Sequence, residues 1–85
     1  MSNIIIKQAR WRSHRGMLEL DLILIPFVEN HFDALNQKEQ ATYQTLLTYP
    51  DPTLYDWFLG QDSPDDKDLN AIVKLIKNKT LLPLK

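Results

Sequence analysis

The sequence contains no cysteine and only two glycines, Gly16 and Gly60, among its 85 residues. Without thiols the chain has neither a disulfide nor a thiolate zinc site, which fits a reducing compartment. Two isolated glycines do not make a glycine-rich phosphate loop. The only histidines, His14 and His31, are distant in sequence and have no supporting carboxylate pair. We therefore expect no metal site.

Long hydrophobic runs are also absent. The longest, residues 22–28, contains Pro26 and is far shorter than the roughly 20 residues that a membrane helix needs. Residues 1–7 lack the basic segment and the long apolar segment of a secretory signal. We expect a soluble, cytoplasmic protein with no segment inserted in a membrane.

The length of the chain predicts one domain, residues 1–85, with one modest core and a radius of gyration of about 12 Å. A domain of this size has little room for a substrate cavity, which favours a binding module over an enzyme. Ser13 and His14 are sequence neighbours that project from different sides of a helix, so they do not form a nucleophile and base pair. We predict that the protein is not an enzyme.

The charges are sorted along the chain, although the net charge is only −1. Residues 1–16 carry four basic side chains and no acid, and all eleven acids lie between Glu19 and Asp68. This pattern is compatible with a bipolar surface that attracts a charged partner. It is equally compatible with basic ends that pack against and neutralise an acidic middle.

Hydrophobic spacing and capping residues predict an all-α, compact five-helix bundle. The first helix is expected over residues 4–15, although the three isoleucines at its start also suit a strand. Gly16 is expected to end it in a left-handed conformation, to serve as N-cap of the next helix, and to let Met17 fold back on Trp11. The second helix, residues 17–31, is apolar almost all round and is therefore expected to be central, with a kink or break at Pro26.

Three shorter helices are expected in the second half. Asn36 and Glu39 resemble a capping box for a helix that stops before Pro50. Asp51 is the expected N-cap of a fourth helix closed by Gly60, with Trp57 in the core. Ser63-Pro64 is expected to begin the fifth helix, and residues 80–85 to be a loose tail. The aspartates at 62, 65, 66 and 68 lack the order of a calcium-binding loop, so helix N-terminal charge explains them better.

The segment Arg15-Gly16-Met17-Leu18-Glu19-Leu20-Asp21 combines an arginine, a glycine and two carboxylates beside the most apolar helix. A purely structural explanation is that Gly16 caps, Arg15 complements one helix end and Glu19 complements the other. The alternative is a surface that another protein recognises, because charges of both signs gather here. The residues of this surface would be Arg12, His14, Arg15, Gly16, Met17, Glu19 and Asp21.

Arg15-Gly16-Met17-Leu18-Glu19 resembles the Arg-Gly-x-x-Glu signature of the SdhE/YgfY family, small assembly factors for the flavinylation of succinate dehydrogenase. The similarity continues through residues 20–27, and residues 54–57 match the family's Leu-aromatic-x-Trp stretch. The length, the helix order and the acidic loop before the last helix also agree, so the resemblance covers nearly the whole chain.

The resemblance implies a non-catalytic factor that binds the flavoprotein subunit of succinate dehydrogenase, and that of fumarate reductase, and promotes covalent attachment of FAD to it. We expect the protein itself to be a monomer. The resemblance implies no firmly bound cofactor of the protein's own. On this basis Arg15 and Glu19 would bind polar groups of the partner, Gly16 would permit close approach, and Met17 would add apolar contact.

Two other classes of function are considered. A nucleic-acid-binding regulator would use the basic N-terminal helix, but such domains usually have a high pI, and this chain has a pI near 6.0. An antitoxin-like interaction module is suggested by an older description of the family as CptB-type antitoxins. It would be recognised by co-purification with a toxin or cytoskeletal protein instead of a flavoprotein.

Overall fold

The computed structural model describes residues 3–80, and the side chains from residue 6 onward. This part of the chain forms five α-helices and one short 3₁₀ helix, with no strand. They are α1 (Asn3–Ser13), α2 (Leu18–His31), η1 (Phe32–Ala34), α3 (Gln37–Leu46), α4 (Asp51–Phe58) and α5 (Lys67–Thr80). The predicted all-α five-helix fold is confirmed, and the radius of gyration is 11.9 Å.

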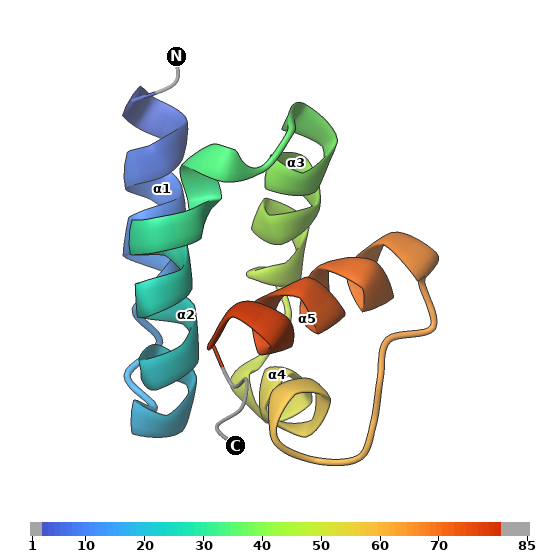
Figure 1. The fold of residues 1–85 in the computed structure, drawn as a ribbon. Coiled ribbons are helices and arrows are strands. Elements are labelled where there is room, and N and C mark those ends of the chain that lie inside the picture. The colour runs from blue at the N-terminus through green and yellow to red at the C-terminus, as the bar shows by residue number, and fades with distance from the viewer. Residues whose placement is uncertain (1–2, 81–85) are drawn as a thin grey trace.

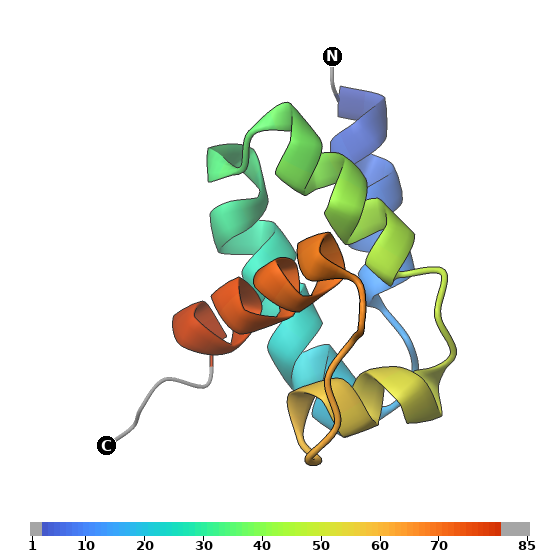
Figure 2. The same ribbon diagram turned by 90° about the vertical axis from the view of Figure 1, so that its right-hand side faces the viewer.

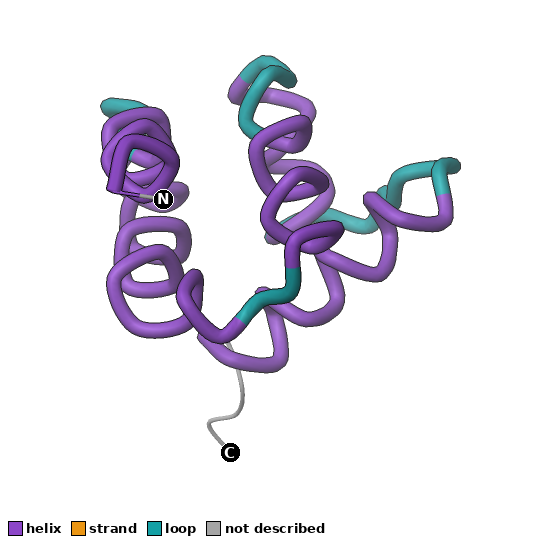
Figure 3. The backbone as a smooth tube through the Cα atoms, turned by 90° about the horizontal axis from the view of Figure 1, so that it is seen from above, coloured by secondary structure: helices purple, strands orange, loops and turns teal. Residues whose placement is uncertain are grey.

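Helices α1 and α2 form an antiparallel hairpin along one edge of the molecule (Figure 1). Helix α5 crosses the middle and contacts α2, α3 and α4, as seen in Figures 1 and 2. Seen from above, the hairpin stands beside α3, and α5 runs obliquely to both (Figure 3). Helix α2 contacts α1, α4, α5 and η1, so its predicted central position is confirmed.

One apolar cluster joins all the helices. Its members are Ala9, Leu20, Ile23, Leu24, Phe27, Val28, Phe32, Leu35, Tyr43, Leu46, Leu47, Leu54, Trp57, Phe58, Leu69, Ile72, Val73 and Ile76. Trp57 belongs to it as predicted and packs its ring 5.0 Å from that of Tyr49. Helix α2 is not buried on all sides, however, because Leu18 and Leu22 are 67% and 64% exposed.

The junction between α1 and α2 differs from the prediction. Helix α1 ends at Ser13, two residues early, and Met17 is the N-cap of α2. Gly16 does adopt a left-handed conformation, with φ of +86°, but it is not an N-cap. Met17 packs against the core and does not cover Trp11, which is 80% exposed. A four-residue connection, residues 14–17, therefore separates the two helices and gives the chain room to reverse.

Helix α2 continues through Pro26 without a break. A proline in a helix removes the amide that would bond the carbonyl four residues earlier. Pro26 and Leu22 are both exposed, so that carbonyl lies on the solvent side of the helix and water can satisfy it. A break at Pro26 is therefore wrong, whereas the kink that was the alternative stays a prediction.

The cap of α3 is as predicted, whereas that of α4 is not. The Asn36 side chain accepts from the Glu39 amide at 2.8 Å, and the Glu39 carboxylate accepts from the Asn36 amide at 3.0 Å. Helix α4 has Pro50 at its N-cap, with no side-chain cap bond, and Asp51 is the first helical residue. The carboxylate of Asp51 instead binds Arg15, as described below.

Helix α5 begins later than predicted. Its amide at Leu69 donates to the Asp66 carboxylate at 3.2 Å, and Asp66 directly precedes the helix. Ser63 lies in the connection, and Pro64 is buried. Because a buried Pro64 holds the connection against the core, the helix starts only after it. Thr80 is the last residue of α5 and not part of a tail; residues 81–85 of the predicted tail lie outside the described residues.

No helix within residues 3–80 has both the length and the apolar character needed to cross a bilayer.

Candidate functional site

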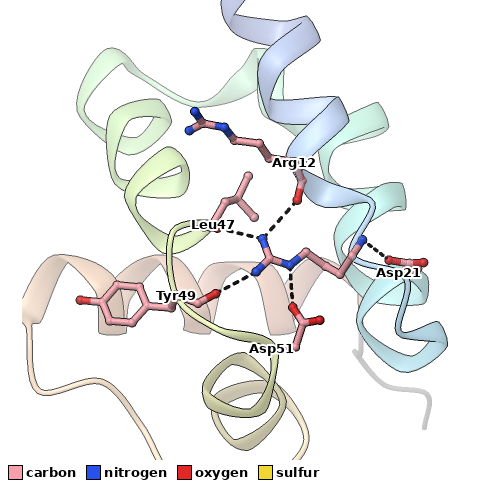
Figure 4. A network of polar contacts seen from close by, with 6 residues as sticks. Arg12, Asp21, Leu47, Tyr49 and Asp51 are labelled. Carbon is pink, nitrogen blue, oxygen red and sulfur yellow. Dashed lines mark hydrogen bonds and ion pairs between the residues drawn. The ribbon is translucent and has the colours of Figure 1, made fainter.

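The connection between α1 and α2, residues 14–17, is called here the motif loop. The side chain of Arg15 leaves it and reaches the segment between α3 and α4 and the first residue of α4. Figure 4 labels the residues that it contacts. Its Nε donates to the Asp51 carboxylate at 2.8 Å. Its Nη1 donates to the carbonyls of Leu47 at 2.8 Å and Arg12 at 3.3 Å, and its Nη2 to that of Tyr49 at 2.8 Å.

These bonds use four of the five N–H donors of the guanidinium. The Arg15 side chain is only 14% exposed, and that of Asp51 is 33% exposed. A planar, permanently charged fork can bind a carboxylate and several carbonyls at once, which an ammonium group cannot do in the same geometry. Arg15 therefore fastens the motif loop to the α3–α4 connection, 32 to 36 residues away.

A second bond fixes the backbone of the loop. The Arg15 amide donates to the Asp21 carboxylate at 2.7 Å, which ties the loop to the first turn of α2. Gly16 follows at φ +86°, where a side chain is strained, and a Cβ placed there would meet nothing within 4 Å. The glycine is thus required by its backbone conformation and not by crowding inside the molecule. The space in front of it is open.

Behind the loop lies a buried polar pair. The Ser13 hydroxyl donates to the Ala9 carbonyl and bonds the Tyr43 hydroxyl, both at 2.7 Å. Both side chains are 0% exposed. Burial raises the pKa of the Tyr43 hydroxyl well above its ordinary value, and the Ser13 bond only partly opposes this shift. The pair links α1 to α3 close to the point where α1 ends.

The remaining predicted site residues lie around the loop. Arg12, His14, Gly16 and Glu19 are exposed, whereas Met17 and Asp21 are partly buried. Glu19 is in the first turn of α2, and its carboxylate makes no hydrogen bond or ion pair with any other residue of the described part. The structure thus brings all seven predicted residues to one corner. Arg15 and Asp21 form hydrogen bonds within the protein, whereas Arg12, His14, Gly16 and Glu19 face solvent.

The acceptors of the Arg15 side chain could not be predicted from the sequence. Three of them are backbone carbonyls, which carry no residue signature. The fourth, Asp51, precedes a proline and is equally well explained as a helix cap. The exposure of Trp11 was also missed, because an aromatic residue beside a turn is more often part of the core.

The predicted residues present a surface of polar and apolar groups at this corner. Within residues 3–80, no three side chains of histidine or acidic type come together in a way that would hold a metal ion. The solvent-facing groups of the corner are the side chains of Arg12, His14 and Glu19 and the open backbone of Gly16, with Met17 partly buried beside them. Such groups can pair with a donor, admit a close neighbour and add apolar contact.

Residues 7–80 match the family described as the flavinator of succinate dehydrogenase. The chain is 49% identical to the FAD assembly factor SdhE of Colwellia psychrerythraea over 79% of its own length and 74% of that protein's. It is 42% identical to that of Coxiella burnetii, covering 84% and 87% of the two chains, and 38% identical to that of Pseudomonas aeruginosa, covering 87% and 88%. The resemblance seen in the motif therefore extends over nearly the whole sequence, and the chain belongs to the succinate dehydrogenase flavinator family of FAD assembly factors.

Proposed function

We propose that this protein binds the flavoprotein subunit of succinate dehydrogenase, and that of fumarate reductase, and promotes covalent attachment of FAD to it. The match of residues 7–80 to the flavinator family carries this proposal. The names of the relatives, FAD assembly factors, support it. The protein acts as a monomer in the cytoplasm, supplies no catalytic group and holds no flavin firmly itself.

The motif loop, together with the first turn of α2, is the proposed contact with the flavoprotein. Glu19 offers an unpaired carboxylate to a base or donor of the partner, and Gly16 lets the partner approach the backbone closely. Met17 adds apolar contact at the edge of the corner. Arg12, His14 and Asp21 border this contact.

Arg15 contributes mainly by holding the loop, because four of its donors are already used within the chain. Its remaining Nη2 N–H is available to a partner carbonyl or carboxylate. A loop fixed in this way loses little conformational freedom on binding, which favours affinity. The bound factor would hold the flavoprotein in the geometry in which its own side chain meets the flavin, an effect of proximity and orientation.

The test uses the flavoprotein subunit from the same organism, produced with and without this protein. Flavin fluorescence in a denaturing gel reports only covalently attached FAD. We expect the band to brighten with the wild-type protein and to dim with Glu19→Gln. Asp65→Asn is the matched control, because Asp65 is also an exposed carboxylate but lies in the α4–α5 connection.

Equal fluorescence with and without this protein, for a flavoprotein shown to accept FAD under other conditions, would overturn the proposed function. Equal dimming by Glu19→Gln and Asp65→Asn would instead remove the motif loop as the contact.

A further inference from the structure

The most exposed large apolar side chains of the described structure lie on the α1–α2 hairpin. Trp11, Leu18 and Leu22 are 80%, 67% and 64% exposed. Leu59, which follows α4, and Tyr55, which lies within it, are only 41% and 37% exposed. A tryptophan is among the residues that gain most free energy from burial, and it is enriched where proteins bind each other. Its position in water therefore requires an explanation.

Trp11 points away from the core. Ala9 and Ser13, on the inner side of α1, are 0% exposed. Lys7, one turn before Trp11, and His14, three residues after it, share its outer side. Trp11 forms a wall of two open hollows, one lined also by Lys7, Arg10 and His14 and the other by Arg12 and His14. The ring thus stands between two basic depressions.

An ion pair joins the exposed face of α2 to this side of α1. Leu18 and Leu22 lie one turn apart, and Glu29 continues the same face of the helix. The Glu29 carboxylate lies 3.1 Å from Nε of Arg10, which lines one hollow beside Trp11. The ion pair therefore connects the outer side of α1 with the outer side of α2. We define the hairpin face as Lys7, Trp11, His14, Leu18 and Leu22.

We propose that the hairpin face is a second contact surface for the flavoprotein subunit, on which Trp11 enters an apolar pocket rimmed by carboxylates. This inference rests on the proposed function. The face borders the motif loop, because His14 belongs to that loop and Leu18 directly follows its last residue, Met17.

The positive charge of α1 predicts that the pocket on the partner is rimmed by acidic side chains. Residues 3–16 contain four basic side chains and no acid. Arg10 is paired with Glu29 and Arg15 with Asp51, whereas Lys7 and Arg12 form no ion pair with the described residues. Two unpaired cations beside an exposed tryptophan complement a partner surface with carboxylates around an apolar centre.

A second copy of this chain fits the face less well. A symmetric contact centred on Trp11 would bring two acid-free helices together, with Lys7 and Arg12 of each copy facing like charges. A membrane surface also fits less well, because Glu19, Asp21 and Glu29 on α2 would be repelled by anionic lipid.

The first experiment measures affinity for the purified flavoprotein subunit by calorimetry. Trp11→Ala should weaken binding at least about tenfold, as expected for a buried aromatic anchor, and Leu22→Ser should weaken it less. Leu59→Ser is the matched control, since Leu59 is an exposed leucine outside the hairpin face. Circular dichroism and urea unfolding verify that each variant is folded. All three residues are exposed, so large losses of stability are not expected.

The second experiment labels the protein with 5-fluorotryptophan, which gives one fluorine resonance for Trp11 and one for the buried Trp57. In the free protein only the Trp11 resonance should shift between H₂O and D₂O. Saturation with unlabelled flavoprotein should remove that solvent shift.

Four outcomes would overturn the inference. If the wild-type protein binds the flavoprotein and Trp11→Ala binds equally well, the second surface is absent while the proposed function stands. If the wild-type protein does not bind, the proposed function fails, and the inference fails with it. Loss of the Trp11 solvent shift on raising the concentration of this protein alone would assign the face to a second copy. Loss with anionic vesicles alone would assign it to a membrane surface.

Discussion

The guanidinium of Arg15 lies 2.8 Å from the carboxylate of Asp51, a residue 36 positions further along the chain. This contact turns a loop motif near the N-terminus into part of the packing between α1 and the α3–α4 connection. Most polar contacts of the motif are therefore made with other groups of the same protein. The groups left for another protein are its glycine and its glutamate.

Arg15→Ala should lower the free energy of unfolding by about 3 kcal/mol, because it leaves a partly buried carboxylate and three carbonyls without their donor. Arg15→Lys should recover only part of this loss, since an ammonium group cannot form the fork. Urea unfolding measures both. In a double-mutant cycle with Asp51→Asn, a coupling energy of about 1 kcal/mol or more is expected. Additive losses would show that the pair is not a stabilising unit.

Glu19→Gln should change the free energy of unfolding by less than about 1 kcal/mol, the size of a charge effect in the first turn of a helix. Its affinity for the flavoprotein should fall by about tenfold or more if the carboxylate meets a partner base. Urea unfolding and calorimetry are carried out on the same preparation. Parallel, small losses in both would leave Glu19 as a helix-terminal charge only.

Gly16→Asn separates backbone conformation from partner approach. Asparagine tolerates the left-handed region better than alanine does, so the Gly16→Asn protein should be more stable than the Gly16→Ala protein. The alanine variant should lose about 1 kcal/mol, because its Cβ meets nothing within 4 Å and only the conformation is strained. The larger asparagine should nevertheless bind the flavoprotein more weakly than alanine. The reverse order of affinities would argue against close approach at Gly16.

The stability should fall above pH 10 because of Tyr43. Its unfolded hydroxyl titrates near 10.0, and burial raises the pKa in the folded state. Below pH 10 the Tyr43 hydroxyl is protonated in both states, so its contribution to the free energy of unfolding does not change with pH. Above it the unfolded state loses the proton first, so the free energy of unfolding falls by about 1.4 kcal/mol per pH unit until the folded-state pKa is reached.

Tyr43→Phe should lack this contribution, although other groups titrate in both proteins. Urea unfolding between pH 9 and 11.5 measures the two slopes, and identical slopes would show that Tyr43 ionises equally in both states.

Asp66→Ala should destabilise the protein by about 1 kcal/mol, the usual cost of removing a helix cap. Ser63→Ala should change the free energy of unfolding by less than about 0.5 kcal/mol, because Ser63 lies in an exposed connection. Thermal unfolding of the two variants compares them directly. A larger effect at Ser63 would restore the start of α5 that the sequence predicted.

Much of the local structure follows from neighbouring residues alone. The apolar spacing is enough to predict five helices and the placing of Trp57 in the core. The bonds between Asn36 and Glu39 form within one turn, so their residue types predict them. Gly16 is the residue with the left-handed backbone, as its position after a basic helix indicates.

The errors arise where distant groups compete for a residue. Asp51 is a good helix cap in isolation, but Arg15 binds its carboxylate and Pro50 takes the capping position. Ser63-Pro64 is a good helix start, but Pro64 is buried and Asp66 caps α5 instead. The break at Pro26 fails because its side of the helix faces water.

Local pattern is enough to predict the helical class, the family and the corner at which the motif residues gather, because periodicity, capping and a continuous motif are properties of near neighbours. Three-dimensional packing alone turns Arg15 inward, leaves Glu19 unpaired and exposes Trp11 to water. These outcomes depend on which groups are brought together across 30 or more residues, and sequence spacing does not encode which of several possible partners a side chain meets.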